Sequence, residues 1–380
     1  MNRLTINLEA LRHNYETVRR WVNAHGGSLV VVTKALCGHE DVLRALATFG
    51  ATKMGDSRLE NLRAIRSAAP QIETWYLRPP RPSALPDLLE LSDVSLNSEL
   101  PTIRQINQFL KGTKSRHSVV LMMELGDLRE GILPGALLDI ASEITSMSNV
   151  DLVGVGANLG CLNGTIPMAE ELSQLCLYHE LLELKFNTKI PYVSAGTSAA
   201  LGLLREGTLP GSVNQFRVGE SILLGTDPVT GQCLPGLQAN VASVEAEIVE
   251  LKEKRLVASG DAANPPFEAI EMDEDPEPGQ RGYRAIVTIG HVDTDIAGLT
   301  PIDSDVQIAG ASSDVTVLNL GEDQNGLRLG DTVTFKPSYS AFVRLMNNPY
   351  SQIELAGQAI SKACATSEHT KMSNLPAHVV

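Results

Sequence analysis

The sequence contains little cysteine and shows no metal-binding spacing. Its five cysteines are odd in number and widely scattered, without a CxxC pair or a His/Cys cluster. This pattern argues against a disulfide framework and is typical of reduced thiols in a cytoplasm. We therefore predict a cytoplasmic protein without a metal site. The cysteines are Cys37, Cys161, Cys176, Cys233 and Cys364.

Basic residues and long apolar runs are also scarce. The chain has 31 Lys and Arg against 45 Asp and Glu, a net charge of −14. This balance argues against nucleic acid or an anionic membrane as a partner, and it agrees with a cationic substrate. The first eight residues hold no apolar signal core, and no apolar run reaches the roughly 18 residues of a membrane span. We expect a soluble protein that acts on a small molecule.

Short apolar runs alternate with amphipathic segments through the first part of the chain. A strand is predicted at 3–7 and a helix at 8–24, followed by the apolar stretch that ends at Lys34. Eight strands in about 200 residues predict a (β/α)₈ barrel. A doubly wound open sheet is the alternative, but no GxGxxG turn follows an early strand. The other strands are predicted near 52–56, 73–78, 93–97, 117–125, 150–159, 190–196 and 215–218, and the helices near 40–48, 58–67, 83–91, 100–111, 135–147, 168–186 and 198–205.

The pattern changes after Gly225 to strands at short spacing, punctuated by Gly, Pro and Asp. These strands predict a β-rich domain of roughly 120 residues. Residues 8–235 should form the barrel, 1–7 and 236–356 the β-rich domain, and 357–380 a flexible tail. The acidic segment 271–282 should be a solvated loop. The strands are predicted at Ala239–Leu251, Arg284–Gly290, Val306–Ala309, Asp314–Leu320 and Thr332–Phe335.

The stretch from Ser28 to His39 is the one around which the barrel is organised. The apolar run Leu29–Val32 reads as a buried strand and leads directly into Thr33 and Lys34. An α/β fold places its chemistry at the carboxyl ends of strands, and a desolvated lysine amine can act as a nucleophile. A lysine that merely extends to solvent is the alternative when this position is considered alone.

Polar residues recur at the ends of later predicted strands, where a barrel brings distant residues to one mouth. Arg129 follows the fifth strand, Asn158 the sixth, Ser194–Ser198 the seventh and Arg217–Ser221 the eighth. Small-residue turns after the seventh and eighth strands commonly hold a phosphate. Considered singly, the Gly-Thr-Ser turn could be a helix cap, Arg217 a structural ion-pair partner and Asn158 a turn residue. Together with Lys34, they predict a pyridoxal phosphate site.

Several motifs resemble the fold-type III pyridoxal phosphate enzymes, the alanine racemase group, and within it the ornithine racemases. The resemblance covers roughly residues 3–356. It implies a (β/α)₈ barrel with a β-rich second domain, and a head-to-tail homodimer whose active sites lie at the interface. The matching stretches are Val32–Ala35, Gly55–Leu62, Leu96–Leu100, Leu125–Gly131, Val193–Ser198, Arg217–Ser221, Asp293–Ile296, Pro301–Asp303 and Gly310–Asp314.

The resemblance also implies roles for individual residues. Lys34 would be the Schiff-base lysine and one of two catalytic bases. Arg217 would face the pyridine nitrogen and keep it unprotonated, which favours racemisation over side reactions. Arg129 would lie near the cofactor's phenolic oxygen and the substrate carboxylate, and Ser313 of the partner subunit would approach that carboxylate. The remaining residues implied to bind the cofactor are Asn158 against the ring, Ser198, Gly219 and Glu220 at the phosphate, and Tyr339.

The opposite-face base departs from the alanine racemase pattern. Where that family has a tyrosine in Gly-Tyr-x-Asp-Gly, this sequence has His291, followed by Asp293. A histidine transfers protons near neutral pH, so we predict His291 as the second base. Asp293, Asp295 and Tyr339 are alternatives for this role, and Asp293 is also predicted to be catalytic.

These features predict a pyridoxal phosphate-dependent racemase of a basic amino acid such as ornithine or lysine. An alanine or broad-specificity racemase is one alternative. A decarboxylase or an aldolase on the same scaffold would need a partner cysteine motif or a metal cluster that the sequence lacks. A non-catalytic pyridoxal phosphate-binding homeostasis protein is a further alternative, but such proteins lack the β-rich domain predicted at 236–356.

Overall fold

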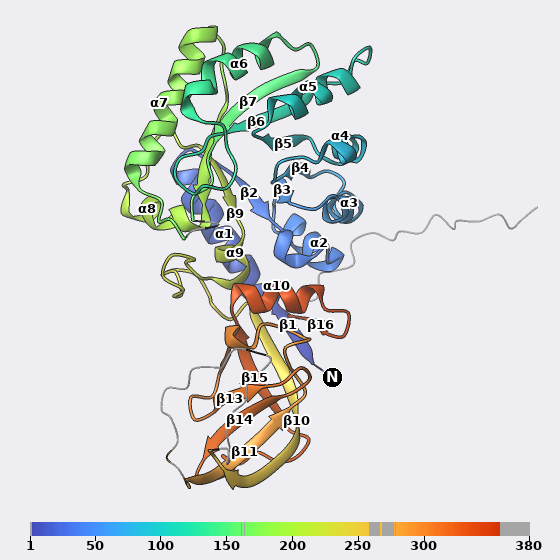
Figure 1. Cartoon of the computed structure of the whole chain (residues 1–380), viewed down its shortest axis with the longest axis vertical. Helices are drawn as coiled ribbons and strands as arrows, with labels where there is room; N and C mark the ends of the chain where they lie inside the picture. The colour runs from blue at the N-terminus through green and yellow to red at the C-terminus, as the bar shows by residue number, and fades with distance from the viewer. Residues whose placement is uncertain are drawn as a thin grey trace, which may run out of the picture.

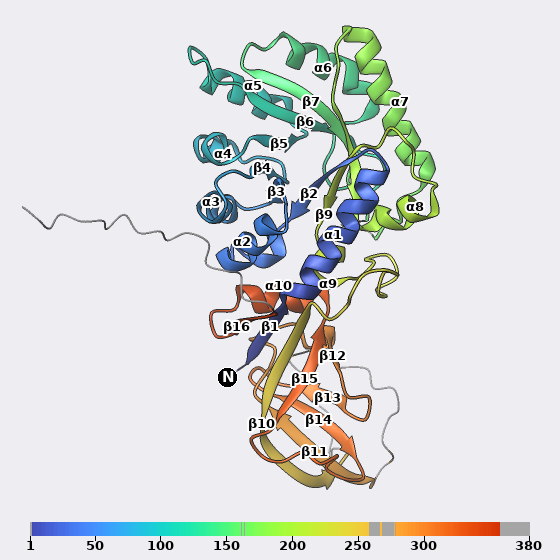
Figure 2. The same cartoon turned by 180° about the vertical axis from the view of Figure 1, so that it is seen from behind.

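The computed structural model describes residues 2–160, 162, 164–257, 267, 277 and 279–357. It has two parts, a barrel ringed by helices and a β-rich sheet below it (Figures 1 and 2). Most of the segment 271–282 and all but the first residue of the predicted tail 357–380 lie outside the described residues. Cys161 and Cys364 lie outside them as well.

Eight parallel strands close into a barrel, which confirms the predicted fold class and makes the open-sheet alternative wrong. The last strand pairs with the first, with Leu29 opposite Phe216 and Val31 opposite Val218. Side chains from the strands fill the interior, among them Val30, Trp75 and Leu96. The strands are β2 (Ser28–Val32), β3 (Lys53–Asp56), β4 (Glu73–Tyr76), β5 (Val94–Asn97), β6 (His117–Met122), β7 (Val150–Gly156), β8 (Tyr192–Thr197) and β9 (Gln215–Val218).

Helices pack around the barrel with their apolar faces inward. The first of them begins at a cap in which the Asn7 side chain accepts hydrogen bonds from the backbone N–H groups of Glu9 and Ala10. The described helices of this part are too short or too polar to cross a bilayer, as is the one in the sheet part. They are α1 (Leu8–Ala24), α2 (Glu40–Thr48), α3 (Leu59–Ala68), α4 (Leu85–Leu91), α5 (Leu100–Phe109), α6 (Leu137–Ser146), α7 (Ala169–Phe186), α8 (Leu201–Glu206) and α9 (Glu220–Leu224).

The second part is one sheet, antiparallel apart from a single pair. The strand nearest the N-terminus, β1 (Arg3–Asn7), is antiparallel to β10 (Ala242–Arg255) and parallel to β16 (Gln352–Ala356). A helix, α10 (Tyr339–Asn347), connects this sheet to the barrel by packing against the turn that holds Lys34. The other strands are β11 (Arg281–Val287), β12 (Leu299–Pro301), β13 (Gln307–Ala311), β14 (Thr316–Gly321) and β15 (Thr332–Pro337).

The structure corrects several predicted boundaries. The strands predicted at 117–125 and 150–159 end at Met122 and Gly156, because the chain turns away there into the loops of the barrel mouth. Arg281 and Gly282, expected in a loop, begin β11. The sequence did not predict β12, β16, α9 or α10, although the Ser338 side chain caps α10 by accepting from the N–H of Ala341.

Polar side chains at the amino end of the barrel bind one another. The Lys53 ammonium donates to the Tyr192 hydroxyl at 2.9 Å and lies 3.4 Å from the Glu73 carboxylate. Glu73 also accepts a 2.7 Å hydrogen bond from the Trp75 indole. His117, which begins β6, is buried as well: its Nε2 hydrogen-bonds with the Ser95 hydroxyl at 2.8 Å, and burial lowers the pKa of this histidine from 6.5 to about 4.

Candidate active site

The buried carboxylate of Asp56 stabilises the turn that carries Lys34. The Thr33 hydroxyl donates to Oδ2 of Asp56 at 2.9 Å, and the Asn61 amide donates to Oδ1 at 3.1 Å. Asp56 is fully buried, and burial raises its pKa. The Gly55–Leu62 motif therefore supports the lysine turn, a role that the sequence reasoning did not assign. Asp56 could have been found from the sequence, because it is a polar residue at the end of the strand next to the one that precedes Lys34.

Lys34 lies just past β2, at the mouth of the barrel. Its Nζ is 5.8 Å from the centre of the Tyr339 ring, which the first residue of α10 contributes. Glu220 follows β9, and its carboxylate accepts from the Thr226 hydroxyl at 3.0 Å. Burial raises the pKa of this carboxyl, while the Thr226 hydrogen bond and the charge of Lys34 act in the opposite direction. Lys34 itself is exposed in the single chain. The reason is that β2 stops at Val32, and a 3₁₀ turn lifts Lys34 above the strand end.

Arg217 is the most deeply buried cation at the mouth, with 6% of its surface exposed. One of its terminal nitrogens donates to the Ser194 carbonyl at 2.7 Å and to the Ser194 hydroxyl. The other donates to the Ala157 carbonyl at 3.0 Å and to Oδ1 of Asn158 at 2.7 Å. These contacts hold the guanidinium across the ends of β7 and β8.

Arg129 lies on a loop after β6, and the Glu124 carboxylate stabilises the conformation of this loop. The Glu124 side chain accepts from the backbone N–H groups of Gly126, Leu128 and Arg129, at 2.6, 3.1 and 3.2 Å. The loop closes at Gly131, whose φ is +148° and where an added Cβ would lie 2.2 Å from the backbone nitrogen of Glu124. Only glycine fits at this turn, which explains why the Leu125–Gly131 motif ends in glycine.

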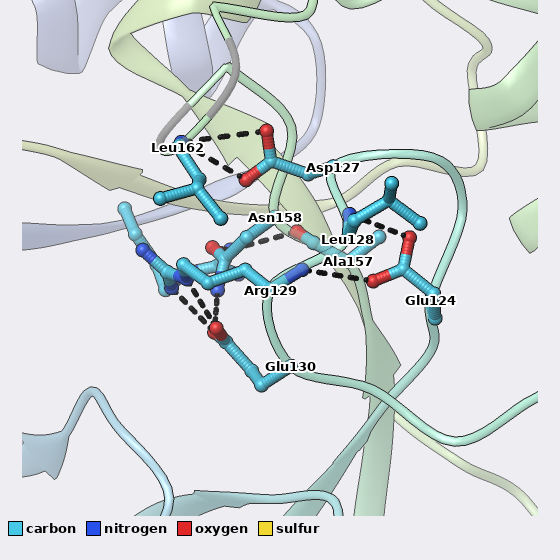
Figure 3. A network of polar contacts seen from close by, with 9 residues as sticks. Glu124, Asp127, Leu128, Arg129, Glu130, Ala157, Asn158 and Leu162 are labelled. Carbon is cyan, nitrogen blue, oxygen red and sulfur yellow. Dashed lines mark hydrogen bonds and ion pairs between the residues drawn. The ribbon is translucent and has the colours of Figure 1, made fainter.

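Figure 3 shows that Arg129 and Asn158 meet on one side chain, Glu130. Nε and a terminal nitrogen of Arg129 donate to the two carboxylate oxygens of Glu130. The Asn158 amide donates to one of these oxygens and accepts from Arg217 with its own oxygen. Glu130 was not among the predicted site residues, because nothing in the sequence alone pairs it with Asn158.

The turn predicted to hold a phosphate is formed by β8 and β9 together. The backbone N–H of Gly219 donates to the Ser198 hydroxyl at 3.3 Å. An added Cβ at Gly219 would lie 3.1 Å from Val32, so the backbone approaches β2 closely there. Next to Ser198, the Thr197 hydroxyl oxygen is buried and has no hydrogen-bond partner in the described part of the chain. An unpaired buried hydroxyl beside backbone N–H groups fits an anionic group such as the phosphate of pyridoxal phosphate.

The remaining predicted residues lie in loops of the sheet part. The backbone N–H of His291 donates to the Ser312 carbonyl at 3.1 Å, and that of Val292 donates to the Ser313 carbonyl at 2.9 Å. Nε2 of His291 is buried without a hydrogen-bond partner among the described residues. Asp293 accepts from the Gly290 N–H at 2.9 Å and from the Asn348 amide at 3.2 Å.

The predicted residues thus fall into two groups within one chain. Lys34, Tyr339 and Glu220 gather at the barrel mouth, as do the Arg129–Asn158–Arg217 network and the Ser198–Gly219 turn. His291, Asp293 and Ser313 form a second group, tied together by the loop contacts just described. Within the described ranges, no three His, Cys, Asp or Glu side chains are placed to hold a metal ion.

Comparisons with known proteins agree with this arrangement. The family model described as "Alanine racemase, N-terminal domain" matches residues 6–228. An ornithine racemase of Acetoanaerobium sticklandii is 34% identical over 354 residues, which cover 93% of this chain and 99% of that protein. A lysine racemase of Thermotoga maritima is 31% identical over 351 residues, covering 92% of this chain and 96% of that protein.

The fold has close counterparts among solved structures. One is the alanine racemase from Bartonella henselae with covalently bound pyridoxal phosphate. It has a TM-score of 0.71 at 15% identity, and the alignment covers 93% of this chain and 99% of that one. The barrel, the mouth residues and the matched motifs lead to one assignment: this chain belongs to the alanine racemase family.

Proposed function

We propose that this chain is a pyridoxal phosphate-dependent racemase that interconverts the enantiomers of a basic amino acid, ornithine or lysine. The observation that carries the proposal is the mouth itself. There an accessible lysine, a buried arginine and an anion-accepting turn lie at the ends of neighbouring strands. The identity to ornithine and lysine racemases over more than nine tenths of the chain supports the basic substrate.

When bound, pyridoxal phosphate supplies an electron sink that makes the α-proton of an amino acid removable. Lys34 would hold the cofactor and move the α-proton at its Nζ on one face. Arg217 and Asn158 would hold the ring, while Ser198, Gly219 and Glu220 would hold the phosphate, with Tyr339 beside Lys34. Arg129 would bind the substrate carboxylate, together with Ser313 of the partner subunit.

A second base must act on the opposite face, and we propose His291 of the partner subunit. Its buried and unpartnered Nε2 supports this choice. Asp293, the other predicted candidate, has hydrogen bonds to both carboxylate oxygens, which suits a role in orienting the His291 turn. This proposal needs a homodimer in which the sheet loops of one protomer complete the mouth of the other.

Two further points are proposals of the same kind. Residues 8–235 would form the cofactor-binding domain, and 1–7 with 236–356 the second domain, which the pairing of β1 with β10 and β16 supports. We also propose a cytoplasmic location. It is supported by Cys37, Cys176 and Cys233, which are all free thiols.

Chiral chromatography after incubating the cofactor-loaded protein with L-ornithine, L-lysine and L-alanine tests the function. We expect ornithine or lysine to be racemised well ahead of alanine. Alanine turnover as fast as that of either diamino acid would overturn the basic substrate. Absence of turnover for all three would overturn the racemase itself.

A further inference from the structure

The network in Figure 3 gives Glu130 a position that neither the motifs nor the relatives assign. Its side chain is 9% exposed, and its carboxylate receives hydrogen bonds from two different mouth residues, Arg129 and Asn158. Asn158 in turn binds Arg217 at 2.7 Å. Glu130 is therefore the link between the arginine predicted to bind the substrate carboxylate and the arginine predicted to bind the cofactor ring.

The chemistry of a carboxylate fixes the direction of this chain of hydrogen bonds. An ionised carboxylate only accepts, so the Asn158 amide must turn its NH₂ toward Glu130 and its oxygen toward Arg217. With the amide reversed, the NH₂ group would face the Arg217 guanidinium, and two donors would oppose each other. Glu130 thus sets the orientation of Asn158, and through it the second contact of Arg217.

Glu130 fixes Arg129 by a different geometry. Nε and a terminal nitrogen of Arg129 meet the two carboxylate oxygens side by side, which locks the guanidinium plane. The charge of Glu130 also compensates that of the Arg129 guanidinium, which it contacts directly. We propose that Glu130 is a positioning residue that couples the orientation of the substrate-binding Arg129 to that of the cofactor-side Arg217. This inference rests on the proposed function.

The variant Glu130→Gln tests the coupling with little change in shape. A glutamine keeps one acceptor oxygen, but its NH₂ group faces an Arg129 donor in either orientation, and the Asn158 donor as well in one of them. The matched control is Glu143→Gln, because Glu143 makes the same two-point contact with Arg104 on the outer face of the barrel. Both variants lose one arginine–carboxylate pair, but only one of them alters the mouth.

Two measurements on the cofactor-loaded variants decide the matter. We expect Glu130→Gln to raise KM for L-ornithine about tenfold or more, since a charge-assisted contact that orients Arg129 is lost. The visible circular dichroism of bound pyridoxal phosphate should also change, because Asn158 and Arg217 reorient. Glu143→Gln should change neither quantity. In the double variant Glu130→Gln/Asn158→Ala, the effects should be less than additive, since both residues act through one contact.

Other results would overturn the inference. Glu130→Gln indistinguishable from Glu143→Gln in KM and in circular dichroism would remove the positioning role. A lower melting temperature with unchanged KM and circular dichroism would make Glu130 a structural residue only. A wild-type chain that racemises nothing would instead overturn the proposed function. The circular dichroism comparison would still show whether Glu130 orients the cofactor-side residues.

Discussion

The two ends of the barrel each carry a lysine, and the two lysines have opposite surroundings. At the amino end, Lys53 donates to Tyr192 and lies against Glu73. Burial alone would lower the pKa of Lys53, but these partners outweigh it and raise the pKa. At the carboxyl end, Lys34 is exposed and lies 5.8 Å from the Tyr339 ring. Lys53 is thus bound by polar partners at one end of the barrel, whereas Lys34 is accessible at the other.

This difference shows how a barrel separates stability from chemistry. At the amino end, Lys53, Glu73, Trp75 and Tyr192 bind one another through side-chain contacts. The carboxyl end keeps the buried hydroxyl of Thr197 unpaired, which costs stability unless a ligand binds there. Substitutions at the amino end should therefore change stability and leave activity intact, and those at the mouth should do the reverse.

The largest expected effect is on activity at Lys34. Lys34→Ala should lower racemisation by about 10⁴-fold, because it removes both the cofactor attachment and one proton-transfer group. The unfolding midpoint should stay close to that of the wild type, since the side chain is exposed. Chiral chromatography and the visible absorbance of bound pyridoxal phosphate measure the two losses. If the absorbance band persists and borohydride still traps the cofactor on the protein, another lysine holds it.

The next largest effect is on stability and comes from His117, the first residue of β6. Its pKa is lowered from 6.5 to about 4 in the folded state, so its contribution is complete above pH 6.5 and is lost as the pH falls toward 4. This histidine alone should reduce the free energy of unfolding by about 3 kcal/mol over that window. Denaturant unfolding at pH 7 and pH 5 should show a shallower decline in His117→Gln, which cannot titrate. An equal decline in both proteins would assign the acid sensitivity to other groups.

A smaller effect is expected from the residue proposed to complete the mouth. His291→Ala should cut racemisation in both directions by about 10²-fold and leave cofactor binding intact. In deuterated solvent, α-proton exchange should persist with one enantiomer only, the one whose proton faces Lys34. Exchange can be followed by NMR for each enantiomer separately. Unchanged racemisation would transfer the role to Asp293, Asp295 or Tyr339.

The smallest effect is expected at Lys53. Lys53→Met should lower the free energy of unfolding by about 1 kcal/mol, because Tyr192 and Glu73 lose a partner that is only partly buried. Racemisation kinetics should not change. A fall in kcat without a fall in the unfolding midpoint would show that the two ends are coupled, contrary to the comparison.

The sequence predicts the barrel well, because few other folds accommodate a long alternation of short apolar runs and amphipathic segments. Lys34, Arg129, Asn158 and Arg217 could be found because each follows a strand end, and strand ends converge. Glu130 could not be found, because its partner Asn158 is contributed by another loop. The exposure of Lys34 was also missed, since a 3₁₀ turn leaves no periodic signal. The helix α10 was overlooked because Pro337 and the preceding strand pattern masked its start.

The position of β1 has a consequence for how the chain is assembled during synthesis. Residues 3–7 leave the ribosome before the barrel strands, yet they lie between β10 and β16, whose last residue is Ala356. Proteins fold from the N-terminus as they emerge, so the barrel can close while this strand still has two unpaired edges. Such long-range pairing makes the sheet the late and slow step of folding. An N-terminal fusion or deletion that disturbs residues 3–7 should therefore leave a closed barrel and an unfinished sheet.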